Sequence, residues 1–70
     1  MKFTREELWE MRIAIQIRLH DEKDRLRDCE ADENAERRNA CANGVKRNIA
    51  ALESAYRKVC DEHARVANRN

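Results

Sequence analysis

The second half of the chain carries a regular apolar repeat. Its members are separated alternately by four and three positions: Val45, Ile49, Leu52, Tyr56, Val59, His63 and Val66. Residues with this spacing lie along one face of an α-helix, like the a and d positions of a heptad. A repeat sustained over three heptads predicts a long, coiled-coil-like helix that packs against another helix.

The first half of the chain offers a matching helix. Thr4 suits an N-cap and Glu7 follows three residues later, so the two form a capping box that predicts a helix start at Thr4. At about 100° per residue, one face of this helix collects Leu8, Met11, Ile15, Leu19, Leu26 and Cys29. The 70 residues include no proline and one glycine, and 41% are charged. This composition favours an all-α fold and disfavours a sheet.

The two faces can be aligned as an antiparallel pair, in which the numbers of facing residues have a constant sum. A sum near 70 or 71 gives these layers: Leu8 with His63, Met11 with Val59, Ile15 with Tyr56, Leu19 with Leu52, Leu26 with Val45, and Cys29 with Cys41 or Ala42. The exception is Glu22, which faces Ile49. We therefore predict a single helical-hairpin domain over residues 1–70, with helices at about 4–31 and 35–68 and a turn at about 32–35.

The predicted core and one alternative turn follow from this alignment. The core consists of Leu8, Met11, Ile15, Leu19, Leu26, Val45, Ile49, Leu52, Tyr56, Val59, His63 and Val66. Asn43-Gly44 is the strongest local turn signal in the chain, so a turn at that dipeptide stays open. If the turn lies near Asn34 instead, Gly44 sits inside the second helix, at a cost of about 1 kcal/mol relative to alanine.

A second apolar stripe on the first helix has no place in such a hairpin. Trp9, Ile13 and Ile17 are spaced by four and point well away from the first stripe. A two-helix hairpin buries one stripe per helix, and an exposed patch of this kind marks an interaction surface. We expect a second copy of the chain to cover it. The hairpin would then dimerise with C2 symmetry into an antiparallel four-helix bundle and act as a structural or adaptor module.

Two other functions remain as alternatives. The chain resembles in style the short, charged helical proteins of bacterial and phage genomes, so by analogy it could be a small inhibitor or adaptor that docks on a larger host protein. A basic stripe on the second helix could instead contact a polyanion or nucleic acid. That stripe consists of Arg47, Lys58, Arg65 and Arg69. The net charge of +1 and the nearby Asp61 and Glu62 count against nucleic acid.

Catalysis and metal binding are not expected. Cys60 and His63 share a helix face, but apolar Leu8 and Met11 would lie opposite them, and a metal site needs three or four ligands. His20 and Asp24 form a solvated i, i+4 pair. We find no nucleophile–base constellation and no glycine-rich phosphate loop, so we expect no enzyme activity and no cofactor.

The cellular setting is inferred from two observations. Charged and polar residues interrupt the stretch from Leu8 to Leu19, so it is neither a signal peptide nor a membrane span. The three cysteines are an odd number, and we expect a cytoplasmic, reducing compartment in which they are small core hydrophobes. Cys29 and Cys41 would face each other near the turn, and in an oxidising setting they could form a disulfide. The sequence leaves that question open.

Overall fold

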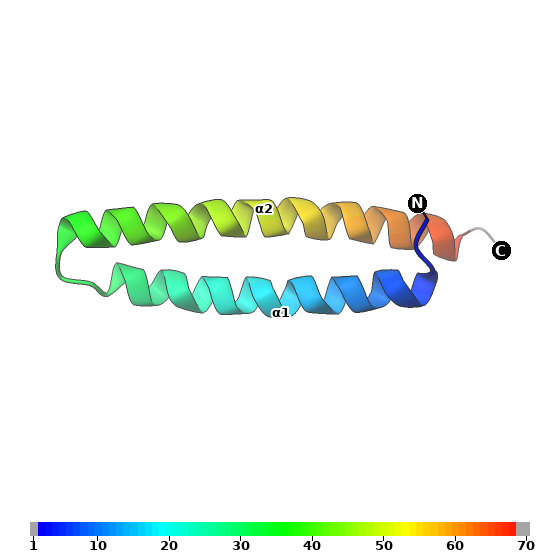
Figure 1. The fold of residues 1–70 in the computed structure, drawn as a ribbon, viewed down its shortest axis with the longest axis horizontal. Helices are drawn as coiled ribbons and strands as arrows, with labels where there is room; N and C mark the ends of the chain where they lie inside the picture. Colours follow the sequence, from blue (N-terminus) through cyan, green and yellow to red (C-terminus); the bar gives the residue numbers. More distant parts are fainter. Residues whose placement is uncertain (1, 69–70) are drawn as a thin grey trace.

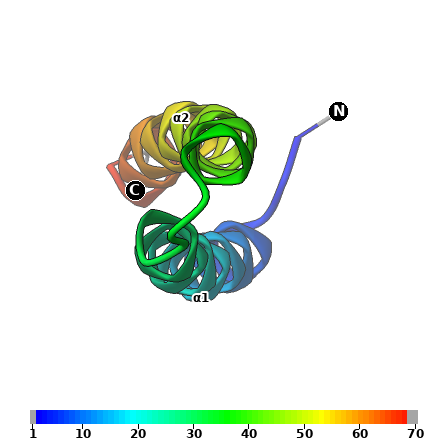
Figure 2. The ribbon, with the colours of Figure 1, turned by 90° about the vertical axis from the view of Figure 1, so that its left-hand side faces the viewer.

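The computed structural model describes residues 2–68 as two antiparallel α-helices that pack side by side (Figure 1). Helix α1 spans Arg5–Glu30 and helix α2 spans Ala35–Ala67. They form a rod of 55 × 17 × 14 Å, and Figure 2 shows the pair end on. The prediction of an all-helical chain with two helices packed against each other is confirmed, since residues 2–68 contain no strand.

The turn lies at residues 31–34 and is held by its own polar side chains. The Asn34 side chain caps α2 by accepting a hydrogen bond from the Arg37 backbone N–H at 3.0 Å. The Asp32 carboxylate accepts another from the Asn34 backbone N–H at 2.9 Å. Asn43 and Gly44 lie inside α2, so the alternative turn at that dipeptide does not form.

The start of α1 shows the predicted capping box. The Thr4 backbone N–H donates to the Glu7 carboxylate at 2.8 Å, and the Glu7 backbone N–H donates to the Thr4 hydroxyl at 3.1 Å. Two N–H groups that the helix itself cannot pair are thereby satisfied. The backbone hydrogen bond from Thr4, followed by the side-chain one, holds the pKa of Glu7 below its ordinary value.

The core is thin and has two buried regions. Leu8 and Val59 are buried toward the end that holds the chain termini, whereas Cys29, Ala42 and Val45 form a buried cluster toward the turn. Leu26 and Ile49 pack against the turn-end cluster and are partly buried. The other residues predicted for the core are also partly buried: Met11, Ile15, Leu19, Leu52, Tyr56, His63 and Val66. Two helices share a single contact face, so most of these side chains keep one edge in solvent.

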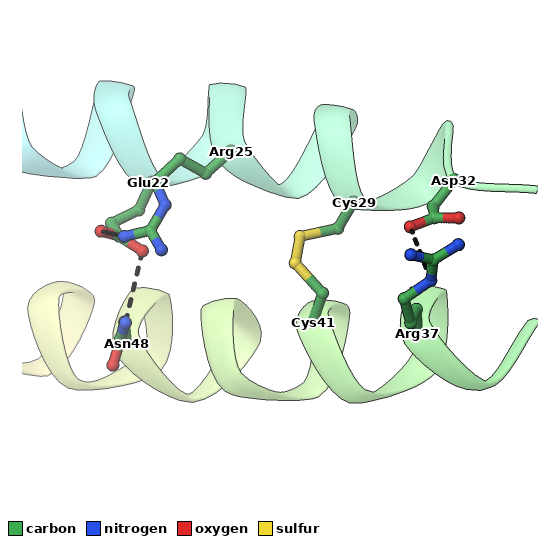
Figure 3. Close-up of a disulfide and its surroundings, with 7 residues drawn as sticks. All are labelled: Glu22, Arg25, Cys29, Asp32, Arg37, Cys41 and Asn48. Carbon is green, nitrogen blue, oxygen red and sulfur yellow. Dashed lines mark hydrogen bonds and ion pairs between the residues drawn. A yellow bond between two sulfur atoms is a disulfide. The ribbon is translucent and has the colours of Figure 1, made fainter. Parts of the chain in front are cut away.

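A disulfide joins the helices near the turn (Figure 3). It links Cys29 to Cys41, whose Cα atoms are 5.7 Å apart, within the usual range for a disulfide. The sequence leaves this bond open, and the expectation that all three cysteines are small core hydrophobes is wrong for Cys41. The antiparallel register brings the two residues level with each other, and Cys41 is exposed rather than buried. Cys60 remains a free, partly buried thiol.

The Glu22 side chain is buried in the helix interface, with 1% of its surface exposed. Its carboxylate accepts a hydrogen bond from the Arg25 guanidinium at 3.0 Å and one from the Asn48 amide of α2 at 3.4 Å. Arg18 forms an ion pair with it at 3.5 Å. The sequence alignment placed Glu22 opposite Ile49, but its polar partner across the interface is Asn48, one residue earlier (Figure 3). The charge that interrupts the apolar face is thus compensated.

Candidate protein-interaction surface

The apolar side chains of the second stripe lie on the N-terminal half of α1. Trp9 is 49% exposed and Ile17 is 60% exposed, while Ile13 between them is partly buried. The i, i+4 spacing places all three along one side of the helix. We call these three residues the Trp9 face. No part of the chain within residues 2–68 buries Trp9 or Ile17.

Neighbouring side chains hold the Trp9 ring in place. The Arg12 guanidinium carbon lies 5.4 Å from the centroid of the Trp9 ring and 5.9 Å from that of Tyr56. Both distances suit a cation–π interaction. The His63 ring of α2 lies 6.0 Å from the Trp9 ring, centroid to centroid, and is tilted by 43°. Trp9 is therefore an exposed ring fixed by contacts on one side.

Arg12 also bridges the two helices through a hydrogen bond. Its Nη1 donates to Nδ1 of His63 at 3.1 Å, which requires that the imidazole proton be on Nε2. Hydrogen bonding to the side chain of Tyr56 raises the pKa of Arg12 above its ordinary value, so the guanidinium stays charged. The Gln16 amide donates to the Tyr56 hydroxyl at 2.8 Å. These polar contacts link α1 to α2 beside the Trp9 face.

Sequence reasoning missed this polar cluster. Arg12 and Gln16 counted there only as interruptions of an apolar stretch, and His63 was placed in the core opposite Leu8. The structure shows His63 partly buried and in contact with Arg12 and Trp9. The antiparallel register could have indicated these contacts. It places Tyr56 and His63 within about one helical turn of the positions on the second helix that face Arg12.

An open hollow adjoins Trp9 at the end of the hairpin where α1 begins. It is lined by Arg5, Glu6, Trp9, Glu10, His63 and Ala67. The aromatic rings supply apolar contact area and the Arg and Glu side chains supply both signs of charge.

Three of the four predicted polyanion contacts lie on α2. Arg47, Lys58 and Arg65 are exposed, and Arg69 lies outside the described residues. Arg65 is engaged by Glu62, whose carboxylate accepts a hydrogen bond from it at 3.0 Å. Polyanion binding through this stripe stays a prediction.

The structure also shows how the candidate metal-ligating side chains are arranged. His20 lies 3.4 Å from the Asp24 carboxylate in an exposed pair, and Asp24 also pairs with Arg27. Among residues 2–68, no group of three or more His, Cys, Asp or Glu side chains is arranged to hold a metal ion. Neither described helix is long and apolar enough to cross a membrane.

Comparison with protein-family models, with curated proteins and with solved structures found no match to this chain. Its function is therefore inferred from the geometry of the molecule itself.

Proposed function

We propose that the chain is a non-enzymatic protein–protein interaction module that self-associates through the Trp9 face. One observation carries the proposal: on a folded hairpin, Trp9 and Ile17 remain about half exposed or more, with Ile13 between them. Large apolar side chains that gather on one side of a helix mark a contact surface, whereas single exposed ones need no explanation.

The energetics favour covering this face. Fully burying one isoleucine side chain contributes about 1.5–3 kcal/mol, and a tryptophan offers a larger area. A hairpin of this size retains only about 3–5 kcal/mol of net stability from its own core. Burial of the surface that these side chains still expose would contribute about a few kcal/mol, before the entropy cost of association is subtracted.

A second copy of the chain is the simplest occupant. Two hairpins that pack through α1 form a C2-symmetric four-helix bundle in which each Trp9 face covers the other. Trp9 is then the anchor, because tryptophan is enriched among the residues that dominate binding energy. The exposed, charged side of α2 stays in solvent in this arrangement. Such a dimer acts as a structural or adaptor module.

Light scattering on variants of the full chain tests the proposal. The variant Trp9→Asp/Ile13→Asp should have the mass of one 8.3 kDa chain, whereas the native chain should have twice that mass or more. The matched control Ala50→Asp/Ala51→Asp places the same charges on the exposed side of α2 and should keep the native mass.

A second variant covers the case in which the double substitution unfolds the chain. Trp9→Ala removes the anchor without adding charge, and it should shift association to higher protein concentration while helicity at saturation is retained. If either variant is folded and associates as strongly as the native chain, the Trp9 face is not the interface.

A further inference from the structure

We propose that the Cys29–Cys41 disulfide is a redox-sensitive staple, and that its reduction loosens the turn half of the hairpin while the half that carries Trp9 stays folded. The turn half means residues 26–45 of the hairpin. This inference concerns residues away from the Trp9 face and does not rest on the proposed function. Figure 3 shows the bond spanning α1 and α2 close to the turn.

The turn half has little apolar material to hold it together. Residues 30–40 contain no apolar side chain larger than alanine. The buried cluster nearest the turn consists of Cys29, Ala42 and Val45, which are small, and the first of these is itself half of the disulfide. Burial contributes roughly in proportion to apolar area, so this cluster stabilises the turn half only weakly.

Other features of this half weaken it further. Gly44 lies inside α2, where glycine disfavours the helix because it has the most backbone freedom to lose. The ion pair between Arg37 and Asp32 has an N–O distance of 3.9 Å, and the Arg37 side chain is 76% exposed. Exposed ion pairs of this kind contribute little. The covalent bond is therefore the strongest constraint between the two helices near the turn.

The opposite half does not depend on the bond. Leu8 is 1% exposed and Val59 is buried, and the Arg12–His63 and Gln16–Tyr56 hydrogen bonds also cross between the helices there. Both large side chains and polar bridges hold this half. A change confined to the turn half is therefore expected to leave it folded.

Reduction of the bond is a simple exchange with a dithiol. The dithiol supplies two electrons and two protons, the sulfur–sulfur bond breaks to give the Cys29 and Cys41 thiols, and the dithiol becomes a disulfide. Cys41 is exposed, so a reductant can approach it. The bond closes a loop across 12 positions of sequence, and its loss should favour opening of the turn half by about a hundredfold.

Hydrogen exchange followed by mass spectrometry tests the proposal on the full chain, with and without dithiothreitol. Exchange should accelerate by about a hundredfold in peptides from residues 26–30 and 41–45, and by less than about threefold in peptides from residues 11–19 and 52–60. Under oxidising conditions, a thiol assay should find one free thiol per chain, that of Cys60, and three after reduction.

Two variants control the measurement. Cys29→Ala/Cys41→Ala should show fast exchange in the turn half without reductant and no further change with it. Cys60→Ala keeps the bond and should respond to dithiothreitol like the native chain. Three free thiols under oxidising conditions, unchanged exchange after reduction, or equal acceleration in both halves would each overturn the proposal.

Discussion

The carboxylate of Glu22 on α1 is tied to the side-chain amide of Asn48 on α2 by a hydrogen bond of 3.4 Å inside the helix interface. Arg18 and Arg25 approach the same carboxylate from the preceding and following turns of α1. A buried charge without such partners would strongly disfavour folding. Because its partners come from both helices, Glu22 also fixes how α1 and α2 align along their length.

Removal of the Glu22 carboxylate should destabilise the hairpin. We expect Glu22→Ala to lower the free energy of unfolding by about 1–3 kcal/mol, since it deletes the acceptor and leaves a gap beside Asn48. Glu22→Gln keeps an acceptor oxygen and should recover part of the loss. Urea denaturation followed by circular dichroism measures both. The neighbouring control Asp21→Ala, on an exposed side chain, should change stability by less than about 0.5 kcal/mol.

Gly44→Ala should stabilise the protein by about 1 kcal/mol. Gly44 lies inside α2 without a positive φ angle, and a Cβ at this position would meet no atom of α1 within 4 Å. Alanine therefore gains helix propensity without a clash. The same denaturation measurement checks this expectation. A loss of stability would show that Gly44 occupies a turn, as the Asn43-Gly44 dipeptide suggests.

The capping box should make the N-terminus of α1 sensitive to acid. The pKa of Glu7 is below its ordinary value in the folded chain because of the Thr4 hydrogen bonds, chiefly the backbone one. The stabilisation by this carboxylate is therefore fully present above the unfolded pKa and is lost as pH falls through the lower, folded pKa. An NMR titration of the Glu7 carboxyl carbon should give a midpoint below the ordinary value for a glutamate side chain.

A matched variant isolates the cause of that shift. Thr4→Pro removes the backbone N–H that donates a hydrogen bond to the Glu7 carboxylate, and it also removes the side-chain hydroxyl. The pKa of Glu7 should therefore return toward its ordinary value. Thr4→Ala removes only the hydroxyl and should return it partway. An unchanged Glu7 midpoint in both variants would contradict the assignment.

Arg12→Ala should free the Trp9 ring. The substitution removes the cation–π contacts with Trp9 and Tyr56 and the hydrogen bond to His63. We expect lower steady-state fluorescence anisotropy for Trp9 and a lower midpoint of thermal unfolding. Arg47→Ala is a suitable control because it removes an arginine from an exposed position of α2 far from Trp9, and Glu22 keeps its partners. Equal anisotropy in the native chain and in the Arg12→Ala variant would show that Arg12 does not hold the ring.

The two-helix architecture could be predicted because it depends on short-range and periodic signals. Thr4 and Glu7 form a local capping box, and the regular spacing from Val45 to Val66 defines the contact face of α2. The constant-sum alignment favoured a turn near Asn34 but left one at Asn43-Gly44 open, and the structure places both of those residues inside α2. These features follow from helical geometry and need no knowledge of side-chain conformation.

The polar interior was harder to predict. An apolar pattern treats Glu22 and Arg12 as defects, yet each has partners on the opposite helix, Asn48 for one and His63 for the other. These contacts depend on the reach and rotamers of long side chains, which periodicity does not specify. The Cys29–Cys41 bond was left open for a different reason, because the sequence does not state the redox environment.

The central claim is that a second copy of the chain covers Trp9, Ile13 and Ile17. Multi-angle light scattering of the native chain over a wide concentration range tests it most directly. We predict a mass of at least twice 8.3 kDa that falls toward 8.3 kDa only on strong dilution. A folded, helical chain that keeps a mass of 8.3 kDa at the highest concentration would contradict the account.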